Sequence, residues 1–270
     1  MIQGTLVQYF ICMKKQKAKV SYRNFLSNIL FFVLLGIGLT LPQAFGEPWV
    51  DAELGLVFTH YNSIRIPGDS GTRFSLTSPF EQESTVSARV RVGYDFLDRH
   101  SLSALVAPLT VRYTGKLDKD TNFAGVTFPK DSSVDATYRF NSYRLTYRYA
   151  LVQEKQGKVA LGLTGKIRDA EIRIQTDTER GSKSNVGFVP LLHLYALYEP
   201  QRILFFLLEA DALAAPQGRA FDVLVAIGYR ISKDLSLRLG YRFLEGGSDS
   251  DEVYNFSYFH YSTVGLQYRF

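Results

Sequence analysis

The segment FDVLVAIGYRI, residues 221–231, decides the fold of this chain, because two kinds of side chain alternate along it. One face is wholly apolar and the other mixes charged and small residues. The apolar face comprises Phe221, Val223, Val225, Ile227, Tyr229 and Ile231, and the other face holds Asp222, Leu224, Ala226, Gly228 and Arg230. Alternation over this length indicates a β-strand whose two faces meet different surroundings.

The same alternation continues outward from this segment through the chain after residue 47. It is clearest in residues 50–59, 85–96 and 235–245, and no long segment shows a helical period. The segments are about 11 to 17 residues long, whereas strands of soluble proteins average about five or six and a tilted membrane strand needs about 9–11. Tyrosine and phenylalanine recur at the ends of the apolar faces, as an interfacial girdle requires. A soluble sandwich would also alternate, but these features favour a transmembrane β-barrel.

We expect an all-β, up-and-down antiparallel barrel of about ten strands, although eight or twelve strands would also fit. The strands are expected near residues 50–60, 85–96, 101–116, 136–153, 159–175, 189–199, 203–213, 220–231, 235–245 and 254–270. The connections alternate between short ones (97–100, 154–158, 200–202 and 232–234) and mostly longer ones (61–84, 117–135, 176–188, 214–219 and 246–253). Short periplasmic turns and longer outer loops are the rule for such barrels, and an even strand count places both termini in the periplasm.

Residues 1–46 form a leader that differs from the rest of the chain. Their five basic residues and no acid equal the formal charge of +5 of the whole sequence, so residues 47–270 are neutral, which argues against a nucleic-acid partner. Basic residues, an apolar run at 25–41 and small residues before a cut after Gly46 indicate a signal peptide, with Met13 as a second candidate start. An anchor helix is the alternative, but the run is at the short limit of a membrane span. The only cysteine, Cys12, lies in this leader.

The C-terminal residues alternate in the same way and end on an aromatic side chain. Val264, Leu266, Tyr268 and Phe270 share one face. A terminal phenylalanine preceded by such a pattern resembles the assembly signal of bacterial outer-membrane β-barrel proteins. The resemblance implies a Gram-negative outer-membrane protein, surrounded by lipid and lipopolysaccharide, whose last strand is read by the barrel-assembly machinery through Tyr268 and Phe270.

The polar face of each strand is expected to turn toward the barrel lumen. The expected lumen-lining residues are Asp51, Glu53, Arg89, Arg91, Asp95, Arg112, Lys116, Arg144, Arg148, Lys166, Arg168, His193, Glu209, Asp211, Asp222, Arg230, Arg238, Arg242 and Arg269. One interpretation is a paired network that fills a narrow, non-enzymatic barrel, because ten strands enclose little more space than the eight whose side chains fill the interior. The other is a narrow solute channel whose excess of basic groups favours anions.

One motif could carry catalysis. His260, Tyr261 and Ser262 are similar to the His-x-Ser element of the lipid A deacylases, outer-membrane barrels that act on lipid at the outer leaflet. The resemblance implies a hydrolase in which His260 takes the proton of Ser262. Thr263 stands where that family has asparagine, and no acid follows Ser262. The structural alternative is an interfacial aromatic girdle that contains a histidine.

Two short acidic motifs and four histidines are further site candidates. An omptin-type protease needs an Asp-x-Asp and an Asp-x-His pair at the outer rim. Asp249 and Asp251 give the first, in a long loop, but Asp98 and His100 give the second in a short turn, so we expect the two at opposite ends of the barrel. The spacing of the four histidines predicts no metal site, and no cofactor is expected.

Overall fold

The computed structural model describes residues 46–270. The predicted signal peptide therefore lies outside the described residues, except for Gly46, the first residue of β1. The strands are β1 (Gly46–Arg65), β2 (Phe74–Ser75), β3 (Glu81–Gln82), β4 (Thr85–Phe96), β5 (His100–Ala107), β6 (Thr110–Lys116), β7 (Thr121–Phe123), β8 (Val126–Phe128), β9 (Ser133–Glu154), β10 (Gly157–Gln175), β11 (Arg180–Gln201), β12 (Leu204–Ala215), β13 (Gly218–Arg230), β14 (Leu235–Asp249) and β15 (Tyr254–Arg269). Within residues 46–270 no helix is long and apolar enough to cross a membrane.

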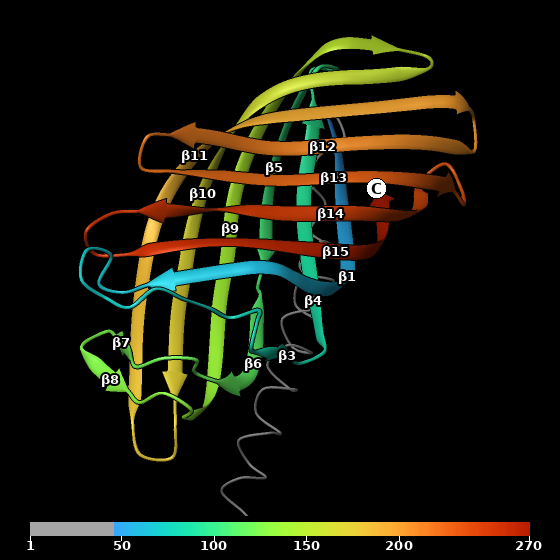
Figure 1. The fold of residues 1–270 in the computed structure, drawn as a ribbon. Helices are drawn as coiled ribbons and strands as arrows, with labels where there is room; N and C mark the ends of the chain where they lie inside the picture. Colours follow the sequence, from blue (N-terminus) through green and yellow to red (C-terminus); the bar gives the residue numbers. More distant parts are fainter. Residues whose placement is uncertain (1–45) are drawn as a thin grey trace, which may run out of the picture. The chain divides into compact units, whose positions relative to one another are not determined.

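Ten strand positions close into an antiparallel barrel, as predicted (Figure 1). The ring runs from β1 through β4, β5, β9 and β10 to β15, and β15 pairs with β1 again, with Trp49 opposite Arg269. β5 and β6 follow one line and both pair with β9. β4 has the predicted bounds, whereas β11 starts at Arg180 rather than at residue 189. Most of the expected loop 176–188 is therefore strand.

The connections differ between the two ends of the barrel. The turns after β4, β9, β11 and β13 are short. The end that carries them also holds both Gly46 and Phe270, and the N–H of Phe270 donates to the carbonyl of Pro48. The longer connections lie at the other end, where they form β2, β3 and the hairpin of β7 and β8 (Figure 1).

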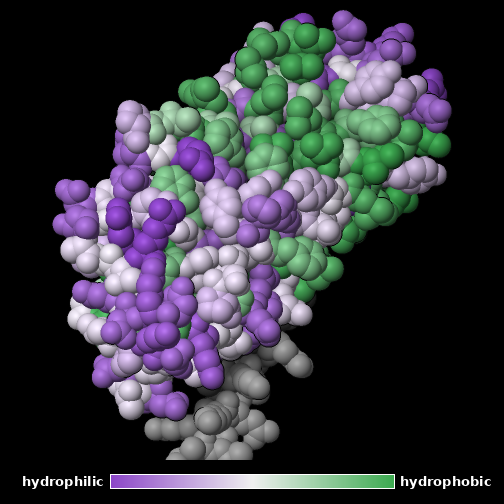
Figure 2. Space-filling view, in the orientation of Figure 1, coloured by the Kyte–Doolittle hydropathy of each residue, from purple (hydrophilic) through white to green (hydrophobic). Residues whose placement is uncertain are grey.

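A belt of large apolar side chains covers the outside of the barrel toward the short-turn end. It includes Leu54, Leu56, Val86, Leu102, Leu145, Tyr147, Leu161, Leu163, Leu192, Val225, Ile227, Leu239, Val264, Leu266 and Phe270, all at least 40 % exposed. In Figure 2 apolar residues gather over one end of the molecule and polar residues over the other. A belt of this extent is far larger than the apolar patches of soluble proteins and fits a lipid-facing surface.

Along single strands the two faces exchange their polarity partway up. In β9 the inward positions are polar from Ser142 to Arg148, while the outward ones are exposed apolar residues, such as Leu145. Above them, toward Ser133, the inward residues are Val134, Ala136 and Tyr138, all buried, and the outward ones are polar. The outward residues there are Asp135, Thr137, Arg139 and Asn141. The side-chain parity stays constant, and only the character of each face changes.

We call the two parts of the barrel the membrane half and the outer half. The membrane half holds polar residues inside and the apolar belt outside. The outer half has an apolar core, to which the long connections contribute Phe74, Leu76, Phe80, Phe123 and Phe128. These loop residues, all at most 6 % exposed, pack on strand residues such as Val111 and Ile174.

Candidate functional site

The lumen of the membrane half is crossed by a network of buried ion pairs. Asp222 on β13 accepts hydrogen bonds from Arg144 on β9 (2.5 Å), Arg242 on β14 (2.5 Å) and Arg89 on β4 (3.1 Å). Glu53 on β1 accepts two more from Arg242, at 2.8 and 3.1 Å, and lies 3.7 Å from Arg89. All five side chains are at most 7 % exposed. The network thus joins strands from opposite sides of the barrel.

A second group of contacts extends the network around Asp211. Its carboxylate accepts hydrogen bonds from Arg144 (2.6 Å) and from the hydroxyl of Thr164 (2.8 Å). Nδ1 of His193 lies 2.8 Å from Oδ1 of Asp211, the same oxygen that accepts from Thr164, and Arg144 donates to Oδ2. Arg144 therefore bridges Asp211 and Asp222, and its side chain is only 1 % exposed.

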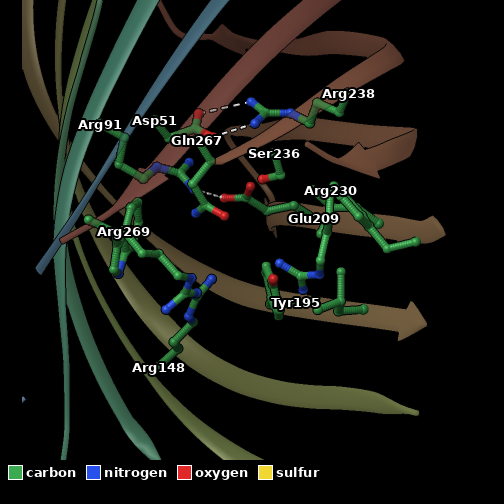
Figure 3. A pocket seen from close by; sticks show the side chains of 14 residues that line it. Asp51, Arg91, Arg148, Tyr195, Glu209, Arg230, Ser236, Arg238, Gln267 and Arg269 are labelled. Carbon is green, nitrogen blue, oxygen red and sulfur yellow. Dashed lines mark hydrogen bonds and ion pairs between the residues drawn. The ribbon is translucent and has the colours of Figure 1, made fainter. Parts of the chain in front are cut away.

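Toward the short-turn end the lumen holds further pairs and a small cavity of about 40 Å³ (Figure 3). Arg238 donates to both oxygens of Asp51 and, at 2.9 Å, to Glu53, and Arg91 donates to Glu209. A cavity of this size admits a few water molecules, not a solute.

Two arginines near this cavity complete the short-turn end. Arg269 pairs with Asp95 at 3.0 Å. The guanidinium of Arg148 lies 4.0 Å from the ring centroid of Tyr195 and 5.8 Å from that of Trp49. Arg148 thus rests on aromatic faces, and no ion pair holds it among residues 46–270.

The charges of the network balance. Its acids are Asp51, Glu53, Glu209, Asp211 and Asp222, and its arginines are Arg89, Arg91, Arg144, Arg238 and Arg242. Because each of these arginines donates to an acid, the middle of the lumen is not a ring of free positive charge. The arrangement suits a filled interior better than an anion-selective constriction.

The remaining expected lumen residues lie elsewhere. Arg230 pairs with Glu199 close to the short-turn end. Lys166 and Arg168 lie opposite Arg144 and Ser142 of β9, at the top of the membrane half, beside a larger cavity that extends into the outer half. Arg112 and Lys116 are exposed, and their expected place in the lumen is wrong. Even-numbered residues of β6 point outward, and at the height of Arg112 and Lys116 the outer surface of the barrel is polar.

The structure places His260 and Ser262 together on the outer face of β15, yet it does not join them. The side chain of His260 shares a hydrogen bond with the hydroxyl of Tyr241 through Nδ1. Its ring lies 4.4 Å from that of Tyr258 and 5.3 Å from that of His60, measured between centroids. No hydrogen bond to Ser262 and no carboxylate partner of His260 occurs within residues 46–270. The surroundings are those of an interfacial aromatic cluster.

The omptin-like motifs are separated by the length of β1. Phe96, next to the turn of Asp98, pairs with Gly46 at one end of β1, and Tyr254, next to the turn of Asp251, pairs with Arg65 at the other end. The two motifs therefore lie at opposite ends of the barrel. In the described part of the chain, no three His, Cys, Asp or Glu residues are placed to hold a metal ion.

The sequence interpretation missed the larger cavity of the outer half, whose volume is about 470 Å³. It lies where β11 and β12 separate: β11 pairs with β12 only from Leu192 onward, although β10 pairs with it up to Arg180. A signal was present in Pro190, because a proline inside a strand is confined to edges and bulges. That signal marks where β11 loses one neighbour.

No protein-family model and no curated protein sequence matches this chain. Among solved structures, the outer membrane protease OmpT of Escherichia coli is 12 % identical with a TM-score of 0.54, over 86 % of this chain and 99 % of that one. The translocator domain of the autotransporter NalP of Neisseria meningitidis is also 12 % identical, over 94 % and 98 % of the two chains, with a TM-score of 0.43. The β domain of the Bordetella autotransporter BrkA is 11 % identical over 84 % and 100 %, with a TM-score of 0.45. The OmpT likeness shows a shared fold, and no shared activity follows from it. The chain therefore has the fold of the bacterial outer-membrane β-barrels, a closed antiparallel barrel of ten strands.

Proposed function

We propose that this chain is a non-enzymatic, integral outer-membrane protein whose lumen is sealed. The observation that carries the proposal is the buried network of Glu53, Arg89, Arg144, Asp222 and Arg242, which links opposite walls of the barrel through contacts of 2.5 to 3.7 Å. A solute could pass only if these pairs separated. Breaking one partner of a buried pair typically costs about 3–5 kcal/mol, so such openings are rare.

The apolar core of the outer half narrows the lumen further. Phe123, Phe128 and Leu76 are fully buried in this core, which lies above the ion-pair network and beside the cavity of about 470 Å³. The function supported best is thus an anchored scaffold that holds a rigid, polar surface above the membrane.

The proposal includes an orientation. The short-turn end, with Gly46 and Phe270, lies in the periplasm, and β2, β3, β7 and β8 face the outside, because outer-membrane barrels keep their longer loops there. A signal peptide in residues 1–46 directs export. The assembly machinery reads Tyr268 and Phe270, whose rings are 4.9 Å apart on the lipid-facing side.

Conductance across a planar bilayer tests the sealed lumen. The refolded protein, inserted at known density, is expected to give no current steps above the baseline at either polarity. A general porin in the same bilayer serves as the insertion control. Reproducible steps, above all anion-selective ones, would support the channel and refute the seal.

A further inference from the structure

The gap between β11 and β12 opens the barrel wall sideways. Residues Arg180–Leu191 of β11 pair with β10 alone, and Leu213–Ala215 of β12 pair with β13 alone. In Figure 1 β9, β10 and β11 run steeply while β12 to β15 cross the view almost horizontally, so the two groups of strands diverge. The cavity of about 470 Å³ lies where the two groups of strands diverge. Its volume is in the range of about 300–1,000 Å³ that is usual for small-molecule sites.

The outer rim of this gap is apolar. Phe188 is 70 % exposed, Val186 is 69 % exposed, and Leu192 further down β11 is 66 % exposed. Phe188 pairs with Ile167 of β10, which belongs to the same apolar belt. The gap therefore opens beside the upper part of the apolar belt.

Two cations without an acidic partner lie on the floor of the cavity. Lys166 is 3 % exposed, and its Nζ lies 4.7 Å from the ring centroid of Phe140; it makes no ion pair with any residue of 46–270. Arg168, two positions further along β10, donates to the amide oxygen of Asn185 at 2.6 Å, and its Nε is buried without a partner. A buried ammonium without a counter-charge is unfavourable, and an anion held between the two cations would relieve this.

The neighbouring acids are already occupied. Asp211 and Asp222 pair with Arg144, Glu171 with Arg173 and Arg139, Glu245 with Arg219, and Glu252 with Lys183. No carboxylate of the cavity wall is therefore left to neutralise Lys166 and Arg168.

We propose that this side cavity binds a single-chain amphiphile with an anionic head, of the kind that a long-chain fatty acid represents. The head lies between Lys166 and Arg168, and the acyl chain leaves through the gap between β11 and β12, over Phe188, into the outer leaflet. A head of this charge satisfies the two cations, and an apolar chain covers the unpaired strand edges from water. The proposal shares with the proposed sealed scaffold only the placement in the membrane. The conductance experiment therefore does not test it, and the labelling experiment below does not test the seal.

Photolabelling tests the proposal with a diazirine-bearing palmitate and with its uncharged hexadecanol analogue. The full-length processed protein is placed in nanodiscs of phosphatidylcholine, irradiated and digested, and the labelled residues are mapped by mass spectrometry. We expect palmitate to label residues 183–191 and 213–215 at least tenfold more than the rest of the apolar belt. The alcohol should label the whole belt evenly. Even labelling by both probes in the unaltered protein would overturn the proposal.

Variants separate charge recognition from a general affinity for the apolar rim. Lys166→Gln combined with Arg168→Gln should lower palmitate labelling at the gap about tenfold, while Lys155→Gln, a change in the exposed turn after β9, should leave it unchanged. Correct folding of each variant is checked by far-UV circular dichroism. Undiminished labelling in a folded double variant would contradict the proposal. Added acetate or inorganic phosphate that displaces palmitate completely would show that the site recognises small anions without a chain, which also contradicts it.

Discussion

The two halves of β9 differ in polarity although one strand forms both. In the membrane half, Leu145 and Tyr147 face outward and Arg144 faces inward; in the outer half, Asp135 faces outward and Val134 inward. The backbone alternation is the same in both. What changes is the medium outside, which is lipid for the first and water for the second. The comparison teaches that alternation gives the parity of a strand, whereas the kind of residue on each face reports the surrounding medium.

The largest expected effect comes from removing the centre of the membrane half. Arg144→Met leaves Asp211 and Asp222 with fewer donors in a buried site, so the free energy of unfolding should fall by about 3–5 kcal/mol. Urea unfolding in detergent or lipid, followed by far-UV circular dichroism, measures it. Lys166→Met is the matched control in the same lumen, because it removes an inward cation that has no acidic partner, and the stability should be unchanged or slightly higher. An equal loss of stability in both variants would mean that the ion pairs of Arg144 contribute no more than an unpaired inward cation.

A smaller effect is expected from a charge on the outward face, and its size should depend on height. Leu145→Arg places a guanidinium against lipid, which costs about 2–4 kcal/mol at the bilayer midplane. Thr114→Arg makes the same change on the outer half, next to Glu81 and Asp135, and should change the stability by less than about 0.5 kcal/mol. Folding titrations in the same lipid compare the two. Similar losses at both positions would break the distinction between the halves.

The smallest effect is expected at the catalytic candidate. Ser262→Ala should leave the mass spectrum of lipid A from expressing cells unchanged relative to the unaltered protein, because no hydrogen bond joins Ser262 to His260. Cells that lack the protein provide the baseline. A product that appears with the unaltered protein and disappears with Ser262→Ala would establish a hydrolase and refute the non-enzymatic scaffold.

Much of the membrane half could be predicted from the sequence. Lipid tolerates almost no charge on the outer face, so positions such as Leu161 and Leu239 had to alternate with inward polar ones, and the number of strands followed. Which inward charges pair could not be read from the strands alone. Arg144 meets Asp211 and Asp222 only because distant strands face each other across the closed barrel.

The outer half was harder to predict because a rule that holds for strands in lipid was also applied to strand segments in water. Arg112 was placed inside on the assumption that polar residues turn inward, which holds only where lipid lies outside. The parity of Leu102, Ala104 and Val106, continued along the same line, points Arg112 outward. In the same way, residues 176–188 were expected to form a connection, whereas Ser182 and Ser184 lie on the exposed side of β11.

One measurement tests the exchange of polarity most directly: the depth profile of nitroxide labels along the outward face of β9. Because the only cysteine of the sequence is Cys12, single cysteines at positions 135, 139, 143, 145, 147 and 151 can be labelled cleanly in the processed protein. Collision rates with oxygen and with a water-soluble nickel chelate are then compared by electron paramagnetic resonance in lipid bilayers. We predict that labels at 143–151 collide mainly with oxygen and labels at 135 and 139 mainly with the chelate. A uniform profile along the strand would contradict the account.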